Sequence, residues 1–100
     1  MRLPNGGQAI VDIRKLRDYS LNPFHSVGKS KARVFASIGI TVADAARLRE
    51  ALLQAAASCD ASPTLLDEYG QRYVVDFEFA GAWILLKGEE YPRLTTCYVL

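Results

Sequence analysis

Hydrophobic positions recur every three or four residues through the first 58 residues, the spacing of one side of a helix. Ile13 and Leu16 predict a short helix that ends at Asn22-Pro23, because the residue before a proline avoids the α region. A second helix is predicted to begin near Ser26, whose hydroxyl can cap the first turn, and to end at a left-handed Gly39. The predicted buried stripe of this second helix is Val27, Val34, Phe35 and Ile38.

A third helix is predicted to begin at Thr41, which has the spacing of a capping box with Asp44, and to end near Ser58. Its many alanines and leucines favour a helix strongly. After Pro63 the pattern changes to alternation, and residues 71–79 place hydrophobic and polar side chains on opposite faces of a predicted strand. The remaining predicted features are strands at residues 64–66, 83–87 and 94–100 and a tight break at Ala80-Gly81.

The order of these elements defines the expected fold class. Short connections between strands imply antiparallel neighbours. We therefore expect an α+β fold with about three N-terminal helices followed by a three- to four-stranded antiparallel sheet, the helices packing on one face. The length fits a single domain over residues 1–100, and no repeat or linker interrupts it. A composition with 50% hydrophobic and 23% charged residues is that of a folded globular protein.

Cysteine content and hydropathy narrow the expected location. No stretch reaches the 18 or so apolar residues of a membrane helix, and the N-terminus lacks the apolar run of a signal peptide. Cys59 and Cys97 lack the spacing of a metal-binding pair, and two cysteines are too few for a disulfide framework. Cys97 is interpreted as a small core residue of the last strand. We expect a cytoplasmic protein with no membrane partner, no metal and no cofactor.

The net charge of +1 conceals an asymmetry between the two halves of the chain. Residues 1–58 carry a charge of +5 and residues 59–100 a charge of −4. Most of the basic excess lies between Arg14 and Arg33, a segment with six basic residues and one acid, Asp18. This segment is either a patch that attracts phosphates or an ordinary solvated helix surface.

His25, the only histidine, lies on a predicted loop just before the second helix. Histidine is well suited to proton transfer near neutral pH, which makes it a candidate general base; a plain surface residue is the alternative. Gly28-Lys29-Ser30 resembles the end of a phosphate-binding P-loop, but the glycine required five positions earlier is Pro23, which excludes a nucleotide triphosphatase. The free N–H groups of a helix N-terminus still favour an anion. The predicted phosphate-binding residues are Ser26, Gly28, Lys29 and Arg93.

Lys31 shares a helix face with Phe35, so it is expected to lean over the core edge toward the loop of His25. Thr96 and Tyr98 lie two apart on the last strand and point to the same side. Two hydroxyls facing a basic residue suit phosphoryl transfer, but they also suit a plain strand. Arg72 and Arg93 can neutralise a phosphorane-like charge or form surface ion pairs. Trp83 is interpreted as core.

Several of these residues together resemble an uncharacterised bacterial domain family, a resemblance that covers nearly the whole chain. It is carried by Leu21-Asn22-Pro23, His25, Gly28, Lys31-Ala32, Phe35, residues 67–73, Trp83 and Pro92-Arg93-Leu94. Such domains also occur at the C-terminal ends of polymorphic and contact-dependent toxins, where they are similar to the barnase/EndoU/colicin/RelE-like group of metal-independent ribonucleases. That group has N-terminal helices and a C-terminal four-stranded antiparallel sheet.

The resemblance implies roles for individual residues. His25 would be the general base, Lys31 or Arg72 would stabilise the pentavalent phosphate, and Thr96 with Tyr98 would orient it. It also implies RNA as the substrate and a small cognate protein, antitoxin-like or immunity-like, as a partner. The oligomeric state stays open.

Three functions compete at this point. A ribonuclease requires His25, Lys31, Thr96 and Tyr98 to converge around one cleft. A non-enzymatic module that pairs with a small neighbouring protein predicts that these residues scatter and that an apolar patch is exposed. An accessory protein that binds nucleic acid through the Arg14–Arg33 segment predicts a continuous basic face without a convergent acid–base group.

Overall fold

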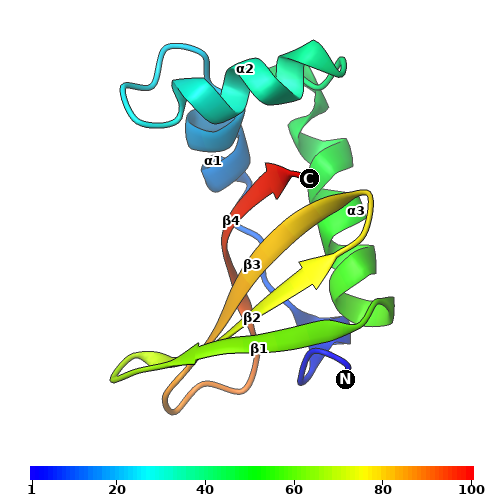
Figure 1. Ribbon diagram of the computed structural model, residues 1–100, viewed down its shortest axis with the longest axis vertical. Helices are drawn as coiled ribbons and strands as arrows, with labels where there is room; N and C mark the ends of the chain where they lie inside the picture. Colours follow the sequence, from blue (N-terminus) through cyan, green and yellow to red (C-terminus); the bar gives the residue numbers. More distant parts are fainter.

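A computed structural model describes all residues from 1 to 100 (Figure 1). A short helix α1 continues directly into a π-helical turn, and two longer helices and four strands follow it along the chain. The elements are α1 (Ile13–Lys15), the π turn (Leu16–Ser20), α2 (Lys29–Ser37), α3 (Ala45–Ser58), β1 (Ala61–Leu66), β2 (Gly70–Asp76), β3 (Phe79–Leu86) and β4 (Arg93–Val99). Short 3₁₀ turns cover Gly6–Gln8 and Val42–Asp44. The expected α+β class is confirmed.

The four strands form one antiparallel sheet in the order β1-β2-β3-β4, so β1 and β4 are its two edges. Consecutive strands are neighbours because the connections between them are short. Figure 1 shows α3 running along the sheet, while α1 and α2 lie together at one end, close to the end of β4. Helix α2 therefore meets the sheet at an edge strand and covers only a small part of it.

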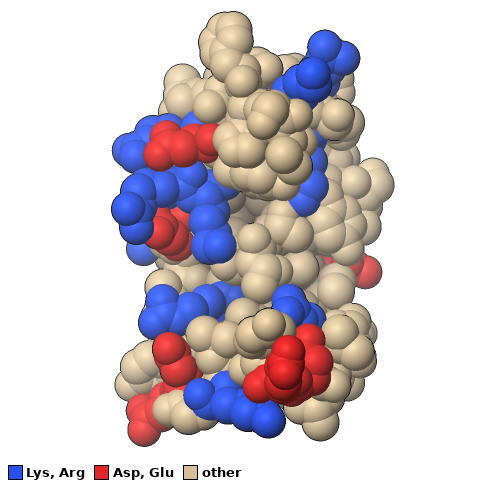
Figure 2. Space-filling model, turned by 90° about the vertical axis from the view of Figure 1, so that its left-hand side faces the viewer, with Lys and Arg blue, Asp and Glu red and all other residues tan.

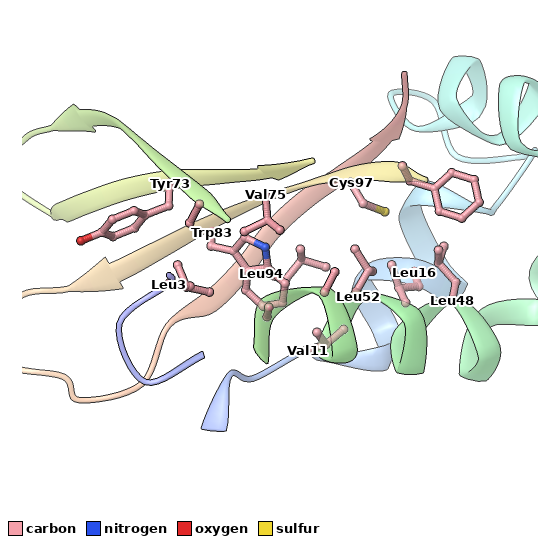
Figure 3. Packing of buried hydrophobic residues seen from close by; sticks show 14 of the residues in the cluster. Leu3, Val11, Leu16, Leu48, Leu52, Tyr73, Val75, Trp83, Leu94 and Cys97 are labelled. Carbon is pink, nitrogen blue, oxygen red and sulfur yellow. The ribbon is translucent and has the colours of Figure 1, made fainter. Parts of the chain in front are cut away.

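The core lies between α3 and one face of the sheet. On that face Tyr73 is paired with Trp83, and Trp83 is paired with Leu94, so three adjacent strands contribute one buried row. Figure 3 shows the Trp83 ring in the middle of this core, with Leu52 of α3 on the helix side. A Cβ at Gly81 would lie 2.8 Å from Nε1 of Trp83, so only glycine leaves room for the indole. The predicted core positions of Trp83 and Cys97 are confirmed.

Alternation along the strands turns the intervening residues to the other face, away from α3. The register there aligns three rows across β2, β3 and β4. These rows are Arg72–Ile84–Arg93, Val74–Ala82–Thr96 and Asp76–Ala80–Tyr98. We call this the outer face. Four of the predicted site residues thus share one side of the sheet.

Local chemistry fixes the boundaries of the third helix as expected. The backbone N–H of Thr41 donates to Oδ2 of Asp44 at 2.9 Å, completing a capping box at the start of a 3₁₀ turn that leads into α3. Gly39 has a φ of +85°, the left-handed conformation expected of a residue that ends a helix. Both predictions are confirmed.

The predicted second helix is wrong in its start and in three of the four residues of its buried stripe, while Phe35 is buried as predicted. It begins at Lys29 rather than near Ser26. Its N-cap residue is Gly28, which has no side chain to bond to the first turn. The side chains of Val27, Val34 and Ile38 are exposed, and only Ala32 and Phe35 are buried. The reason is that α2 crosses the edge of the sheet, so its covered stripe is only two residues wide.

The predicted strand at residues 71–79 is divided by a turn. Phe77 and Glu78 connect β2 to β3, and the N–H of Phe77 donates to the carbonyl of Phe79 at 2.8 Å. The break predicted at Ala80-Gly81 is wrong, because both residues lie inside β3. Their small side chains serve packing, since Gly81 accommodates Trp83 and Ala80 is fully buried.

Candidate functional site

The ammonium group of Lys31 lies where α2 crosses β4. Its Nζ donates a hydrogen bond to Oγ1 of Thr96 and lies 5.9 Å from the centre of the Tyr98 ring. Thr96 and Tyr98 both project from the outer face, and Lys31 reaches them over the sheet edge. Lys31 and Thr96 are 65 residues apart in sequence, so this contact depends on the complete fold. We call Lys31, Thr96 and Tyr98 the edge cluster.

No carboxylate neutralises the charge of the edge cluster. The ion pairs of the chain all use arginines, and none of them includes Lys31. Helix α2 itself contains three basic residues and no acidic one. A partly buried ammonium group that is held by a hydroxyl and an aromatic ring keeps its charge available to an anion.

A pocket of about 200 Å³ opens beside the edge cluster. Val34 and Phe35 of α2 and Val99 of β4 supply its apolar walls, and Ser30 borders it. Lys31 and Tyr98 complete the lining. The sequence interpretation did not find this pocket, because it assigned Val34 to the core. The only signal for the pocket in the sequence was an apolar residue, Val34, on the same helix as Lys29 and Lys31.

Arg72 and Arg93 lie on the same outer face but in a different row from Thr96 and Tyr98. Each has a carboxylate partner: Nε of Arg72 is 3.2 Å from Asp67, and Nη2 of Arg93 is 3.1 Å from Glu89. The pKa of Asp67 is lowered, chiefly by the N–H of Tyr69 and also by Arg72. These arginines are thus largely neutralised and stand apart from the edge cluster.

His25 uses its imidazole to shape the loop before α2. Its Nδ1 accepts hydrogen bonds from the N–H groups of Val27 at 3.0 Å and Gly28 at 2.9 Å. The ring also packs edge-on against Tyr19, with centroids 4.7 Å apart. A neutral imidazole that accepts at Nδ1 carries its proton on Nε2. His25 would have to release both loop bonds before either nitrogen could take a proton from a substrate.

The anion site expected at the start of α2 is partly occupied by the chain itself. The N–H groups of Val27 and Gly28 bond to His25, and the N–H of Lys29 donates to the His25 carbonyl at 3.0 Å. A Cβ on Gly28 would lie 2.3 Å from the carbonyl oxygen of Tyr19, so this glycine is required by packing. Ser26 and Lys29 are exposed. The N–H groups of Val27, Gly28 and Lys29 are therefore not available to a phosphate, whereas those of Ser30 and Lys31 make no backbone hydrogen bond.

The basic segment Arg14–Arg33 is only partly a basic surface. Arg14 pairs with Asp12 at 2.8 Å, and Arg17 pairs with Asp18 at 2.9 Å. The hydrogen bonds from Arg14 lower the pKa of Asp12 to about 2. The basic residues of the segment that have no carboxylate partner are Lys15, Lys29, Lys31 and Arg33. Figure 2 shows Lys and Arg side chains over much of one side of the molecule, with acidic groups beside some of them.

Two other chemical features complete the description. Cys97 is buried against Ser20, and burial raises the pKa of its thiol. Both cysteines are free. No group of three or more His, Cys, Asp or Glu side chains gathers at one place. No helix is long and apolar enough to cross a membrane.

The fold and the edge cluster define a small α+β domain with an unpaired lysine between a helix and the last strand of a meander sheet. The chain belongs to the DUF6883 family, described as a domain of unknown function, whose model matches residues 2–100. No curated protein and no solved structure matches the chain.

Proposed function

We propose that this domain is a metal-independent ribonuclease that binds the phosphodiester backbone of RNA at the edge cluster. The observation that carries the proposal is the convergence of Lys31, Thr96 and Tyr98 from α2 and β4, with no carboxylate to neutralise the lysine. The ribonuclease interpretation required His25 to join these three residues, but its imidazole is bonded to its own loop, so the requirement is met only in part. The resemblance to toxin-type ribonucleases supplies the reaction.

In the proposed reaction the 2′ oxygen of a ribose bonds to the adjacent phosphorus, and the bond from phosphorus to the 5′ oxygen breaks. The proton of the 2′ hydroxyl leaves to solvent, and the departing 5′ oxygen takes one up. The products are a 2′,3′-cyclic phosphate and a 5′ hydroxyl. Lys31 stabilises the charge that develops on the phosphate oxygens, a contribution that is typically the largest single one in such sites. Thr96 and Tyr98 hold the ammonium group and orient the phosphate.

The role proposed for His25 changes with its geometry. As a general base it would need a free lone pair, and its only lone pair accepts two loop N–H groups. We therefore make His25 a positioning residue, which sets the loop before α2 and so the start of the helix that carries Lys31. Arg72 and Arg93 are proposed to contact neighbouring phosphates after exchanging their carboxylate partners.

The test is cleavage of a fluorescent RNA oligonucleotide by the purified protein in EDTA, which inhibits contaminating metal-dependent nucleases. The expected products end in a 2′,3′-cyclic phosphate, identified by mass spectrometry, and DNA of the same sequence stays intact because it lacks the attacking hydroxyl. Induced expression in bacteria should also degrade total RNA. Intact RNA in both assays would overturn the proposal.

A second candidate is a module that pairs with a small protein. One observation favours it: Leu65, Leu66 and Tyr69, at the end of the β1–β2 hairpin, are all exposed. Exposed apolar groups on an edge strand can receive a partner. Leu65→Glu with Leu66→Glu should abolish co-purification with a small co-expressed cognate protein and leave RNA cleavage unchanged. Retained co-purification would exclude the hairpin as the docking surface.

A further inference from the structure

The pocket beside the edge cluster has the size of a site for one flat ring. Its volume of about 200 Å³ is well below the roughly 300 Å³ at which sites for drug-sized ligands begin. An apolar cavity of about 150 Å³ is enough for benzene. A nucleobase is larger than benzene and much smaller than a drug. The pocket therefore fits a single base rather than a nucleoside with its sugar.

We propose that this pocket binds a nucleobase of the RNA, next to the phosphate that Lys31 holds, and so sets the base preference of the enzyme. The inference rests on the proposed function for the identity of the substrate. It adds a binding subsite made of Ser30, Val34 and Val99, none of which belongs to the edge cluster.

The chemistry of the lining fits a base better than any other part of RNA. Val34, Phe35 and Val99 offer apolar walls, and aromatic or apolar side chains are what bases pack against when they are unstacked. The Tyr98 ring forms part of the same lining.

The charge at the mouth of the pocket selects a ligand that is both flat and anionic. Lys31 borders the pocket and has no carboxylate partner. Helix α2, which forms one wall, holds three basic residues and no acid. A ligand that buries an apolar ring in the pocket and carries a phosphate at its mouth satisfies both features. A nucleotide has this construction.

Val34 shows that the pocket is open to such a ligand. Its side chain is 48% exposed although it is aliphatic and lies on an otherwise polar side of α2. Replacing it by tryptophan would fill much of the pocket and leave Lys31, Thr96 and Tyr98 unsubstituted. An exposed helix position tolerates this change, so the variant should fold.

The experiment measures binding of the four nucleoside 3′-monophosphates and of ribose 5-phosphate, which has no base, by titration calorimetry. The wild type should bind at least one nucleotide tenfold or more tighter than ribose 5-phosphate. Val34→Trp should remove this difference and leave ribose 5-phosphate binding within threefold. Leu65→Trp on β1, at a 56% exposed position three strands from β4, is the control and should preserve the difference.

Each outcome separates the pocket from the proposed reaction. A nucleotide preference that survives in Val34→Trp, or a wild type without such a preference, overturns the base pocket even if RNA is cleaved. A preference that Val34→Trp removes, in a protein that does not cleave RNA, confirms the pocket and overturns the ribonuclease.

Discussion

The edge cluster and the loop around His25 both contain polar groups, but only in the loop do these groups fully satisfy one another. In the loop, the imidazole and the backbone N–H groups of Val27 and Gly28 satisfy one another. In the edge cluster, Lys31 contacts a hydroxyl and a ring, and no carboxylate pairs with it. A polar group that is already hydrogen-bonded within the fold must break that bond before it can bind a ligand, which costs energy. A charge without a counter-ion can stabilise a bound anion directly. The comparison favours Lys31 over His25 as the centre of the site.

The largest effect should come from Lys31→Ala, which removes the charge from the edge cluster. We expect RNA cleavage to fall by a factor of about 100 to 1,000, as when a main stabiliser of transition-state charge is lost. Lys29→Ala, at an exposed lysine on the same helix, is the matched control and should cost less than threefold. Initial rates with a fluorescent RNA measure both. Equal losses in the two variants would show that general basicity matters and the cluster does not.

The next effect should come from Gly28→Ala, which tests how closely the loop is packed. The added Cβ would lie 2.3 Å from the carbonyl oxygen of Tyr19, so the backbone must shift. We expect a loss of about 2 kcal/mol in the free energy of unfolding, a typical cost of overpacking. Urea denaturation measures it, with Gly7→Ala as the control because a Cβ there meets nothing within 4 Å. An unchanged stability would mean that the loop is loose.

Thr96→Val removes the hydroxyl that accepts from Lys31 and keeps the shape of the side chain. We expect cleavage to fall about tenfold, since one hydrogen bond to a charged group is worth about 1.5 kcal/mol or more. The KM for RNA should change less than kcat, because the ammonium group remains but is no longer aimed. Thr95→Val, one residue earlier, is the control, because the hydroxyl of Thr95 donates to the carbonyl of Ala82 and not to the edge cluster. A purely structural role would lower stability and leave kcat unchanged.

His25→Ala should lower stability more clearly than it lowers catalysis. Two backbone N–H groups lose their acceptor, a loss comparable to removing a helix cap, which costs about 1 kcal/mol. His25→Asn offers a short acceptor and should recover part of the stability. Cleavage at saturating RNA should fall less than tenfold in both variants. A loss of 1,000-fold or more, with a changed pH profile, would restore His25 as the general base.

The smallest effect is expected for Arg14→Ala, at the exposed start of the basic segment. Because Arg14 is already paired with Asp12, RNA affinity should change less than twofold. The pKa of Asp12 should rise from about 2 part of the way to its ordinary value of 3.8, because the side-chain hydrogen bonds of Arg14 are gone while the backbone N–H of residue 14 still donates. An NMR titration of Asp12 follows this change. A large loss of RNA affinity would show that RNA displaces the ion pair.

Sequence patterns predicted the features that depend on neighbouring residues. The capping box of Thr41 and Asp44, the left-handed Gly39 and the buried Trp83 are all local matters of turn chemistry or strand alternation. The exposure of Val34 was not predictable in the same way. An apolar side chain is buried only if another element covers it, and α2 lies across a sheet edge that leaves Val34 uncovered.

The candidate site likewise has features that local sequence patterns predict and features that they do not. Strand alternation predicts that Thr96 and Tyr98 share a face, and the register adds Arg72 and Arg93 to it. The approach of Lys31 to that face depends on how α2 packs, which no pattern within the helix contains. The use of Nδ1 of His25 by its own loop depends on backbone conformation between two helices. It therefore could not be anticipated from the spacing of residues.

The position of β4 also has a consequence for the order of folding. The strands β1 to β4 pair as a meander, so each hairpin can close over a short loop, while the contact of Lys31 with Thr96 must close 65 residues. Loop closure grows costlier with length, so we expect this contact to form late. In a nascent chain whose β4 is still inside the ribosome, Lys31 lacks its contacts with Thr96 and Tyr98. Such a chain would be harmless to the RNA around it until its last strand docks.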